Sequence, residues 1–111
     1  MKLTLAAVLI AVVPLTAAHA QSLSGDQIKK IYPGTWKLTT KKGAKGSLVL
    51  NRDGSGLIRV GSYKSPIVWK VSGNRFCASR VTSKGLVETC STAKRVGKNK
   101  YRNSNGSVIS K

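Results

Sequence analysis

The spacing of turn residues after residue 33 constrains the fold more than any other feature of the sequence. From Gly34 onward, short hydrophobic runs are separated by Gly, Pro, Asn, Asp and Ser. In one such run, Ile67, Trp69 and Val71 alternate with polar or exposed-type neighbours, as in a half-buried strand. Turn signals recur about every eight to twelve residues, which is typical of all-β domains. The pattern predicts seven or eight antiparallel strands in an up-and-down meander, closed as a small barrel or packed as a sandwich.

Two turns and three aromatic residues refine this expectation. Asp53-Gly54 is a strong hairpin signal, and Asn105-Gly106 separates the last two hydrophobic runs. Trp36, Trp69 and Phe76 occupy inward positions of the expected strands. In a barrel of this size, inward side chains as bulky as these predict a filled interior.

The segment before the strands predicts one short helix. Ser24 is placed to act as the N-cap, and Gln27 three residues later completes a capping box. Leu23 and Ile28 occupy the positions of a hydrophobic staple, and Pro33 ends the helix. We expect a helix of two turns that closes one end of the domain.

The first twenty residues have the layout of a cleaved signal peptide. Lys2 precedes an apolar run over residues 3–13, and a small-x-small cleavage site ends at Ala20. The run is shorter than the roughly 20 apolar residues that span a bilayer. We therefore expect a periplasmic or secreted protein with three parts: a signal peptide (1–20), an arm and helix (21–33), and one β domain (34–111).

The two cysteines, Cys77 and Cys90, predict a structural disulfide. In a hairpin that turns at residues 82–85, Val81 faces Leu86 and the cysteines face each other. Closing a loop of about thirteen residues stabilises a small domain by roughly 3 kcal/mol. A redox motif would place the cysteines as C-x-x-C. A zinc site needs four ligands, and the only histidine, His19, lies in the segment expected to be removed.

Glu88 shares the face of the two cysteines in this register. We expect it to pair with one of the many cations, because a buried carboxylate without a partner is costly. The alternative is an inward carboxylate in a pocket. A bulge in the hairpin would instead turn Glu88 outward.

Charge is the strongest indication of a partner. The chain carries 20 Lys and Arg against three acidic residues, a net charge of +17. Such a balance favours contact with polyanions, although a cationic surface can also serve solubility alone. Four candidate anion-binding residues occupy expected outward strand positions and four occupy adjoining turns: Lys37, Lys41, Arg59 and Lys70, then Lys42, Lys45, Arg52 and Lys64. Five more surround Tyr101: Lys94, Arg95, Lys98, Lys100 and Arg102.

The sequence does not indicate catalysis. Without a histidine in the mature chain, no Ser-His-Asp or Cys-His arrangement can form. Asp26 is expected in the first helical turn and Asp53 in a turn, so each carboxylate has a local structural role. We expect no enzyme activity, no cofactor and no metal site.

Several short motifs resemble small exported bacterial domains of unassigned function. The shared elements are G-T-W at 34–36, W-K-V-S-G-N-R-F-C at 69–77 and E-T-C at 88–90. More loosely, the chain is similar to lipocalin-like bacterial inhibitors of secreted metalloproteases. In these a G-x-W motif opens an eight-stranded barrel, and an arm containing S-L, here Ser22-Leu23, occupies the protease cleft. Their disulfide lies in the first half of the domain, unlike the cysteines of this chain.

Three hypotheses about function follow. The leading one is a monomeric, exported binding protein whose cationic surface contacts an anionic polysaccharide, glycolipid or other polyanion; nucleic acid is a less natural partner after export. The second is protease inhibition, which requires the arm 21–23 to be exposed and free of the barrel. The third is carriage of a small ligand, which requires a cavity.

Overall fold

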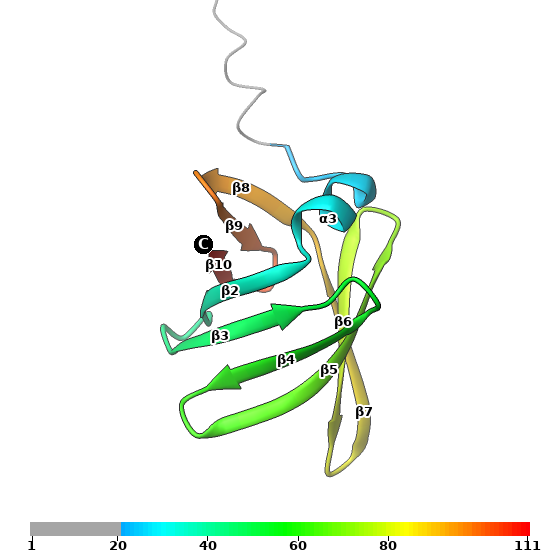
Figure 1. Cartoon of the computed structure of the whole chain (residues 1–111), viewed down its shortest axis with the longest axis vertical. Helices are drawn as coiled ribbons and strands as arrows, with labels where there is room; N and C mark the ends of the chain where they lie inside the picture. Colours follow the sequence, from blue (N-terminus) through cyan, green and yellow to red (C-terminus); the bar gives the residue numbers. More distant parts are fainter. Residues whose placement is uncertain (1–20) are drawn as a thin grey trace, which may run out of the picture.

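The computed structural model describes residues 21–111 and contains one helix and nine strands (Figure 1). All strand pairs are antiparallel, which confirms the all-β fold. In chain order the elements are α3 (Gly25–Ile31), β2 (Gly34–Thr39), β3 (Lys45–Leu50), β4 (Ser55–Val60), β5 (Tyr63–Ser72), β6 (Arg75–Thr82), β7 (Gly85–Ser91), β8 (Ala93–Gly97), β9 (Lys100–Asn103) and β10 (Val108–Ser110).

The helix begins with the predicted capping box. The Ser24 Oγ accepts a hydrogen bond from the Gln27 amide at 3.2 Å, and the Gln27 Oε1 accepts one from the Ser24 amide at 2.8 Å. These two bonds satisfy backbone donors that a helix start otherwise leaves unpaired. Ile28 and Tyr32 are fully buried. The helix therefore sits over one end of the sheet, as expected, and contributes its apolar side to the core (Figure 1).

The nine strands form one sheet in the order β7-β6-β5-β4-β3-β2-β10-β9-β8. It is a meander in which β10 also pairs with β2, so the first strand of the sheet in sequence lies beside the last. The sheet curls into a half-barrel (Figure 1). The count exceeds the expected seven or eight because residues 85–97 form two strands, which Thr92 separates.

The two edges of the sheet are therefore consecutive in the chain. β7 pairs with β6, and β8 pairs with β9 on the other side of the seam. The free edge of β8 is covered, because the Leu23 amide donates to the Ala93 carbonyl at 2.8 Å and Ser22 bridges Lys94. No second strand pairs with β7 in the part of the chain that the structure describes. The barrel is closed at the helix end and open along β7.

Aromatic side chains fill the closed end. The Tyr32 ring centroid lies 6.0 Å from that of Trp36, 5.1 Å from Phe76 and 6.1 Å from Tyr101. The Tyr32 hydroxyl donates to the Oδ1 of buried Asn103 at 2.7 Å. Burial, with a smaller contribution from Tyr101, raises the pKa of Tyr32 well above its usual value. The prediction of a filled interior is correct for this end only.

The predicted turns form as expected from their side chains. The Asp53 Oδ1 accepts hydrogen bonds from the Ser55 amide at 2.9 Å and hydroxyl at 2.6 Å. These bonds hold the pKa of Asp53 below its usual value. Asn105 closes the β9–β10 turn in the same way, accepting from the Ser107 amide at 2.9 Å. Gly54 and Gly106 adopt the positive φ angles that these turns require, 95° and 96°.

Candidate functional site

The β6–β7 hairpin contains the predicted disulfide. Cys77 and Cys90 are bonded and lie directly opposite each other, and the register continues through Val81 and Leu86. Cys77 is almost fully buried. No free cysteine exists among residues 21–111. A bond of this kind is characteristic of oxidising compartments outside the cytoplasm.

Glu88 pairs with a cation, as expected, and the alternative of an inward carboxylate in a pocket is wrong. The hairpin has no bulge, and Phe76 faces the core, so the alternate residues on the cysteine face turn outward. The Glu88 Oε2 lies 3.7 Å from the Lys70 Nζ, and both side chains are largely exposed. A pair of this type contributes little to stability. Although Glu88 lies beside both cysteines, their Sγ atoms are bonded to each other and do not offer thiolates to a metal.

Strand register gathers seven exposed cations on the outer surface of the sheet. One row crosses six strands through Lys100, Ser110, Lys37, Ser47, Arg59 and Lys64, each opposite the next. A second row lies two residues away from the first along each strand that they share. It passes through Lys94, Arg102, Val108, Thr39 and Lys45. Strands lie about 4.8 Å apart, so cations on alternate strands are about 10 Å from each other. We call these seven residues the basic face: Lys37, Lys45, Arg59, Lys64, Lys94, Lys100 and Arg102.

The other candidate cations lie outside these rows. Lys41 and Lys42 occupy the β2–β3 turn, Arg52 the β3–β4 turn and Lys98 the β8–β9 turn. Lys41 was expected on a strand, whereas Lys45 and Lys64 were expected in turns but lie within strands. Lys70 pairs with Glu88, and the Arg95 Nε donates to the Gly97 carbonyl.

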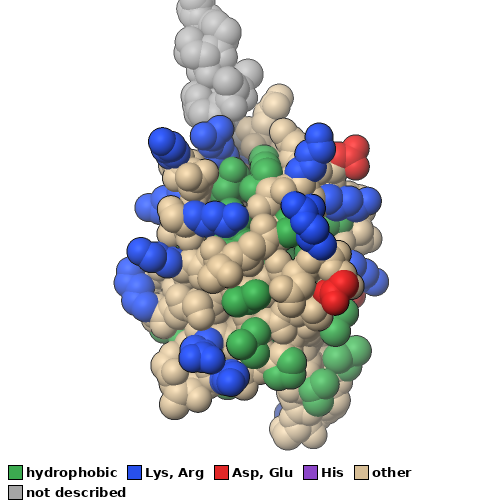
Figure 2. Space-filling model, in the orientation of Figure 1, with side chains coloured by type: hydrophobic (Ala, Val, Ile, Leu, Met, Phe, Trp, Pro, Cys, Tyr) green, Lys and Arg blue, Asp and Glu red, His purple; other side chains and the backbone are tan. Residues whose placement is uncertain are grey.

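Hydrophobic residues that are exposed or partly exposed form a band beside the basic face. Val49, Leu57 and Pro66 lie opposite one another on the outer surface of β3, β4 and β5, and Val81 lies opposite Leu86. Val68, Val81 and Leu86 are 64%, 74% and 71% exposed. Figure 2 shows hydrophobic side chains running diagonally toward the β6–β7 hairpin at lower right, with many Lys and Arg to their left. We call this set the apolar band: Val49, Leu57, Pro66, Val68, Val81 and Leu86.

The open end of the barrel contains a cavity of about 310 Å³. Its walls are mainly hydrophobic side chains that face inward from six strands: Leu38, Leu48, Ile58, Ile67, Phe76, Ala78 and Val87. One side is polar and is formed by the end of β9 and by the β2–β3 and β9–β10 turns: Thr40, Lys41, Asn103, Asn105 and Ser107. Sequence reasoning missed this cavity, because inward aromatic residues at one end of a barrel do not determine how the other end is filled.

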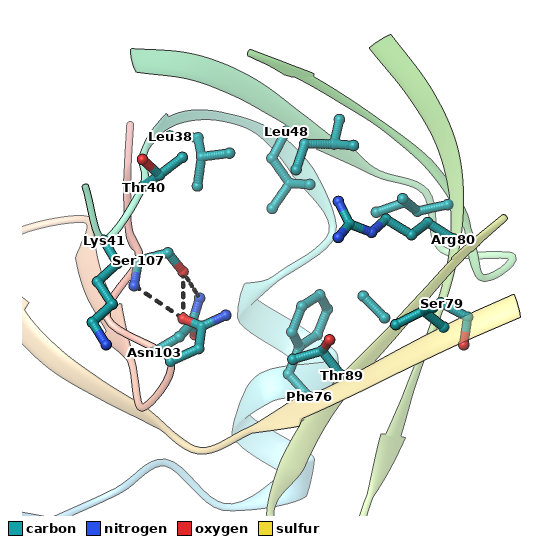
Figure 3. A pocket seen from close by; sticks show the side chains of 15 residues that line it. Leu38, Thr40, Lys41, Leu48, Phe76, Ser79, Arg80, Thr89, Asn103 and Ser107 are labelled. Carbon is teal, nitrogen blue, oxygen red and sulfur yellow. Dashed lines mark hydrogen bonds between the residues drawn. The ribbon is translucent and has the colours of Figure 1, made fainter. Parts of the chain in front are cut away.

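Arg80 is the functional candidate that sequence reasoning missed. It follows Phe76 and Ala78 at alternate positions of β6, so the period-two pattern could have placed it inward. Figure 3 shows its guanidinium pointing into the cavity, across from Asn103 and Ser107. Its Nη1 donates to the Tyr63 hydroxyl over a long 3.5 Å.

Neither similarity to known proteins nor the helix indicates a function for the chain. No family model, curated protein or solved structure matches the chain. In residues 21–111, no helix has the length and hydrophobicity needed to cross a membrane.

Proposed function

We propose that this is an exported, non-enzymatic binding protein whose basic face contacts an anionic surface of the cell envelope, and that the partner is a phosphorylated glycolipid. The observation that carries this proposal is the alignment of seven exposed cations in two adjacent rows. The signal-peptide layout and the disulfide both support a periplasmic or secreted location.

The distribution of carboxylates supports this proposal. Asp53 is held in its turn, Asp26 lies in the first turn of α3, and Glu88 lies beside Lys70. None of the three acidic residues of the described chain therefore neutralises a member of the basic face. Lysine and arginine side chains near an anionic membrane surface each contribute about 1 kcal/mol to binding. Several of them acting together give a useful affinity without a deep pocket.

The apolar band favours a glycolipid over a polysaccharide. Arg59 and Leu57 are two residues apart on the same face of β4, and Lys64 and Pro66 have the same relation on β5. The cations and the hydrophobic side chains can therefore meet one surface together. Lipid surfaces offer both phosphate groups and acyl chains, and binding to them grows with buried apolar area and with charge attraction. A polysaccharide offers only the charges.

Neither alternative hypothesis has equal support. The inhibitor hypothesis requires a free arm, but Leu23 is buried and hydrogen bonded to β8. The cavity meets the requirement of the carrier hypothesis and is treated separately below.

Cosedimentation with vesicles that contain a phosphorylated anionic lipid tests the proposal. The wild-type protein is expected to bind, and binding should weaken steeply as salt rises, because the contacts release bound counterions. A K37Q/R59Q double variant should bind more weakly and with a shallower salt dependence. A K29Q/K30Q variant removes the same charge from α3, outside the basic face and the apolar band, and should bind like the wild type.

A second pair of measurements separates glycolipid from polymer. V81S/L86S removes two exposed members of the apolar band, and it should weaken vesicle binding while leaving retention on a heparin column unchanged. If both double charge variants lose binding equally, total charge rather than the basic face is responsible, and the proposal is wrong. If V81S/L86S binds vesicles as well as the wild type, the partner is a polymer instead.

A further inference from the structure

We infer that the cavity at the open end of the barrel is a second binding site, independent of the basic face, and that it takes a small amphiphilic anion whose acid group pairs with Arg80. The hydrophobic body of this ligand would lie among the inward side chains of β2 to β7. Arg80 lies at the mouth, where a carboxylate could reach both its guanidinium and solvent.

The walls determine the chemistry of the ligand body. Leu38, Leu48, Ile58 and Ile67 come from four neighbouring strands, and the Phe76 ring separates the cavity from the filled end (Figure 3). A hydrophobic cavity with a few polar groups at one side is the usual form of a small-molecule site. The volume of about 310 Å³ is at the small end of the range of about 300–1,000 Å³ for ligand sites. This size suits a short alkyl or aromatic acid.

The polar groups determine the charge of the ligand. On one side of the cavity, the side-chain amide of Asn103 already has hydrogen-bond partners. Its Oδ1 accepts from the Tyr32 hydroxyl, and its Nδ2 donates to the Ser107 Oγ at 3.1 Å. On the opposite side, Arg80 has only the long contact with Tyr63. A guanidinium presents five donors in a fork that matches a carboxylate. Arg80 and Lys41, on opposite sides of the cavity, are therefore the charged groups with unused donors, and their complement is an anion.

No carboxylate of the protein competes for Arg80. The ion pair found in residues 21–111 joins Lys70 and Glu88 on the outer surface, whereas Arg80 faces inward. Asp26 and Asp53 lie in the helix and in the β3–β4 turn. Arg80 is exposed at the mouth of the cavity and has no carboxylate partner in the described part of the chain, so its guanidinium is available to an external anion.

The route into the cavity is the free edge of β7. The helix and the arm close the other end, where Leu23 and Ala93 are hydrogen bonded. Along β7, Val87 and Thr89 line the cavity but are themselves exposed. A ligand can therefore enter past these two residues without displacing a strand.

Octanoate, with about ten non-hydrogen atoms, is the probe, and two-dimensional amide NMR at high salt is the measurement. High salt suppresses binding to the basic face, so this experiment can fail or succeed independently of the proposed function. Octanoate should produce saturable shifts at Phe76 and Ala78. Octanol, which lacks the charge, should bind more weakly, and acetate, which lacks the tail, should produce no shift at these residues.

Two variants with a matched control decide the role of Arg80. R80Q should weaken octanoate binding roughly tenfold to a hundredfold, as expected for a charge-assisted hydrogen bond, and should remove the preference over octanol. R59Q removes an equal charge from the outer surface and should leave octanoate binding unchanged. T89W places a ring at the entrance and should abolish the shifts even if R80Q fails to fold.

Three results would overturn the inference. These are the absence of saturable octanoate shifts in the wild type, equal binding of octanoate and octanol, and an equal effect of R80Q and R59Q. Unchanged octanoate binding in a folded T89W protein would also exclude the cavity as the site.

Discussion

At the scale of single residues, Tyr32 does the most to connect the helix to the sheet. Its ring contacts three other aromatic rings, and its hydroxyl bonds to Asn103, which is 5% exposed. Asn103 in turn bonds to Ser107 beside the cavity. A single side chain therefore connects the closed end of the barrel to the polar wall of the candidate site.

Replacing Tyr32 with Phe should lower the free energy of unfolding by about 1–3 kcal/mol. The change removes the hydroxyl and leaves the buried Asn103 Oδ1 without its donor, which costs more than an ordinary hydrogen bond. Urea denaturation at neutral pH measures the difference. Tyr63→Phe is the control, because Tyr63 is 43% exposed and its hydroxyl makes only a long contact. Equal losses in the two variants would contradict this account.

Tyr32 should also make the free energy of unfolding depend on pH in the alkaline range. The pKa of Tyr32 is raised in the folded state above the ordinary value of 10.0. Up to pH 10 the group is protonated in both states. Above that, the unfolded chain loses the proton first, so stability falls as pH rises toward the folded pKa, by at most about 1.4 kcal/mol per pH unit for this group. The decline above pH 10 should be shallower in Tyr32→Phe; parallel curves would exclude Tyr32 as a cause.

The disulfide gives a third prediction. Replacing both Cys77 and Cys90 with Ser should cost roughly 3 kcal/mol of stability, the value expected for a closed loop of this length, for a sequence separation of 13. Urea denaturation of the variant, and of the wild type with and without reductant, measures the loss. Reductant should have no effect on the variant. A variant as stable as the oxidised wild type would show that the bond does not stabilise the fold.

At the scale of elements, the sequence predicts most of what local chemistry determines. The capping box, the Asp53 turn and the register of the cysteine hairpin depend on residues close together in the chain, and all three form as expected. The sequence predicted that Glu88 pairs with a cation, but it left open whether the side chain points inward or outward. The register specifies only that Glu88 shares a face with Cys77, and packing of Phe76 against Tyr32 determines which face is inside. That packing joins residues 44 positions apart, so no local pattern contains it.

The helix cap is directly testable. Ser24→Ala removes the acceptor of the Gln27 amide and should cost about 1 kcal/mol, the usual value for a lost N-cap. Because α3 covers the filled end of the barrel, the loss should appear in global unfolding as well as in the far-ultraviolet signal. Ser83→Ala, at an exposed position in the β6–β7 turn, is the matched control. If both serine variants lose equal stability, the cap does not contribute.

At the scale of the whole molecule, the sequence predicted the class of fold but not the cavity. Alternation identifies inward residues such as Leu48 and Ile58, but it does not say whether opposite walls touch. Here the opposite walls do not touch. Within residues 21–111, β7 pairs only with β6, whereas β8 pairs with β9 and is hydrogen bonded to the arm. The break at Thr92 between these two edge strands is a property of the curled sheet and has no signature in the local sequence.

The net charge of the folded domain should make its stability depend on salt. Without Lys2, residues 21–111 carry a net charge of +16, and self-repulsion of this size opposes the compact state. Raising sodium chloride from about 10 to 150 mM shortens the Debye length from about 30 to 8 Å, so the free energy of unfolding in urea should rise. K37Q/R59Q should show a smaller rise than the wild type. Stability that falls with salt would mean that ion pairs outweigh the repulsion.

The pairing of β2 with β10 has a consequence for the timing of folding. Lys37 and Ser110 are opposite each other although 73 positions separate them, and the sheet is incomplete until that pair forms. In the described chain the other seven strand pairings join strands that are consecutive in the sequence, so β2–β10 is the one pairing that has to bring distant segments together. A chain that has emerged only as far as β9 has no partner for the outer edge of β2. The hairpins from β2 to β7 can form earlier, but the sheet can be completed only after the last strand is available.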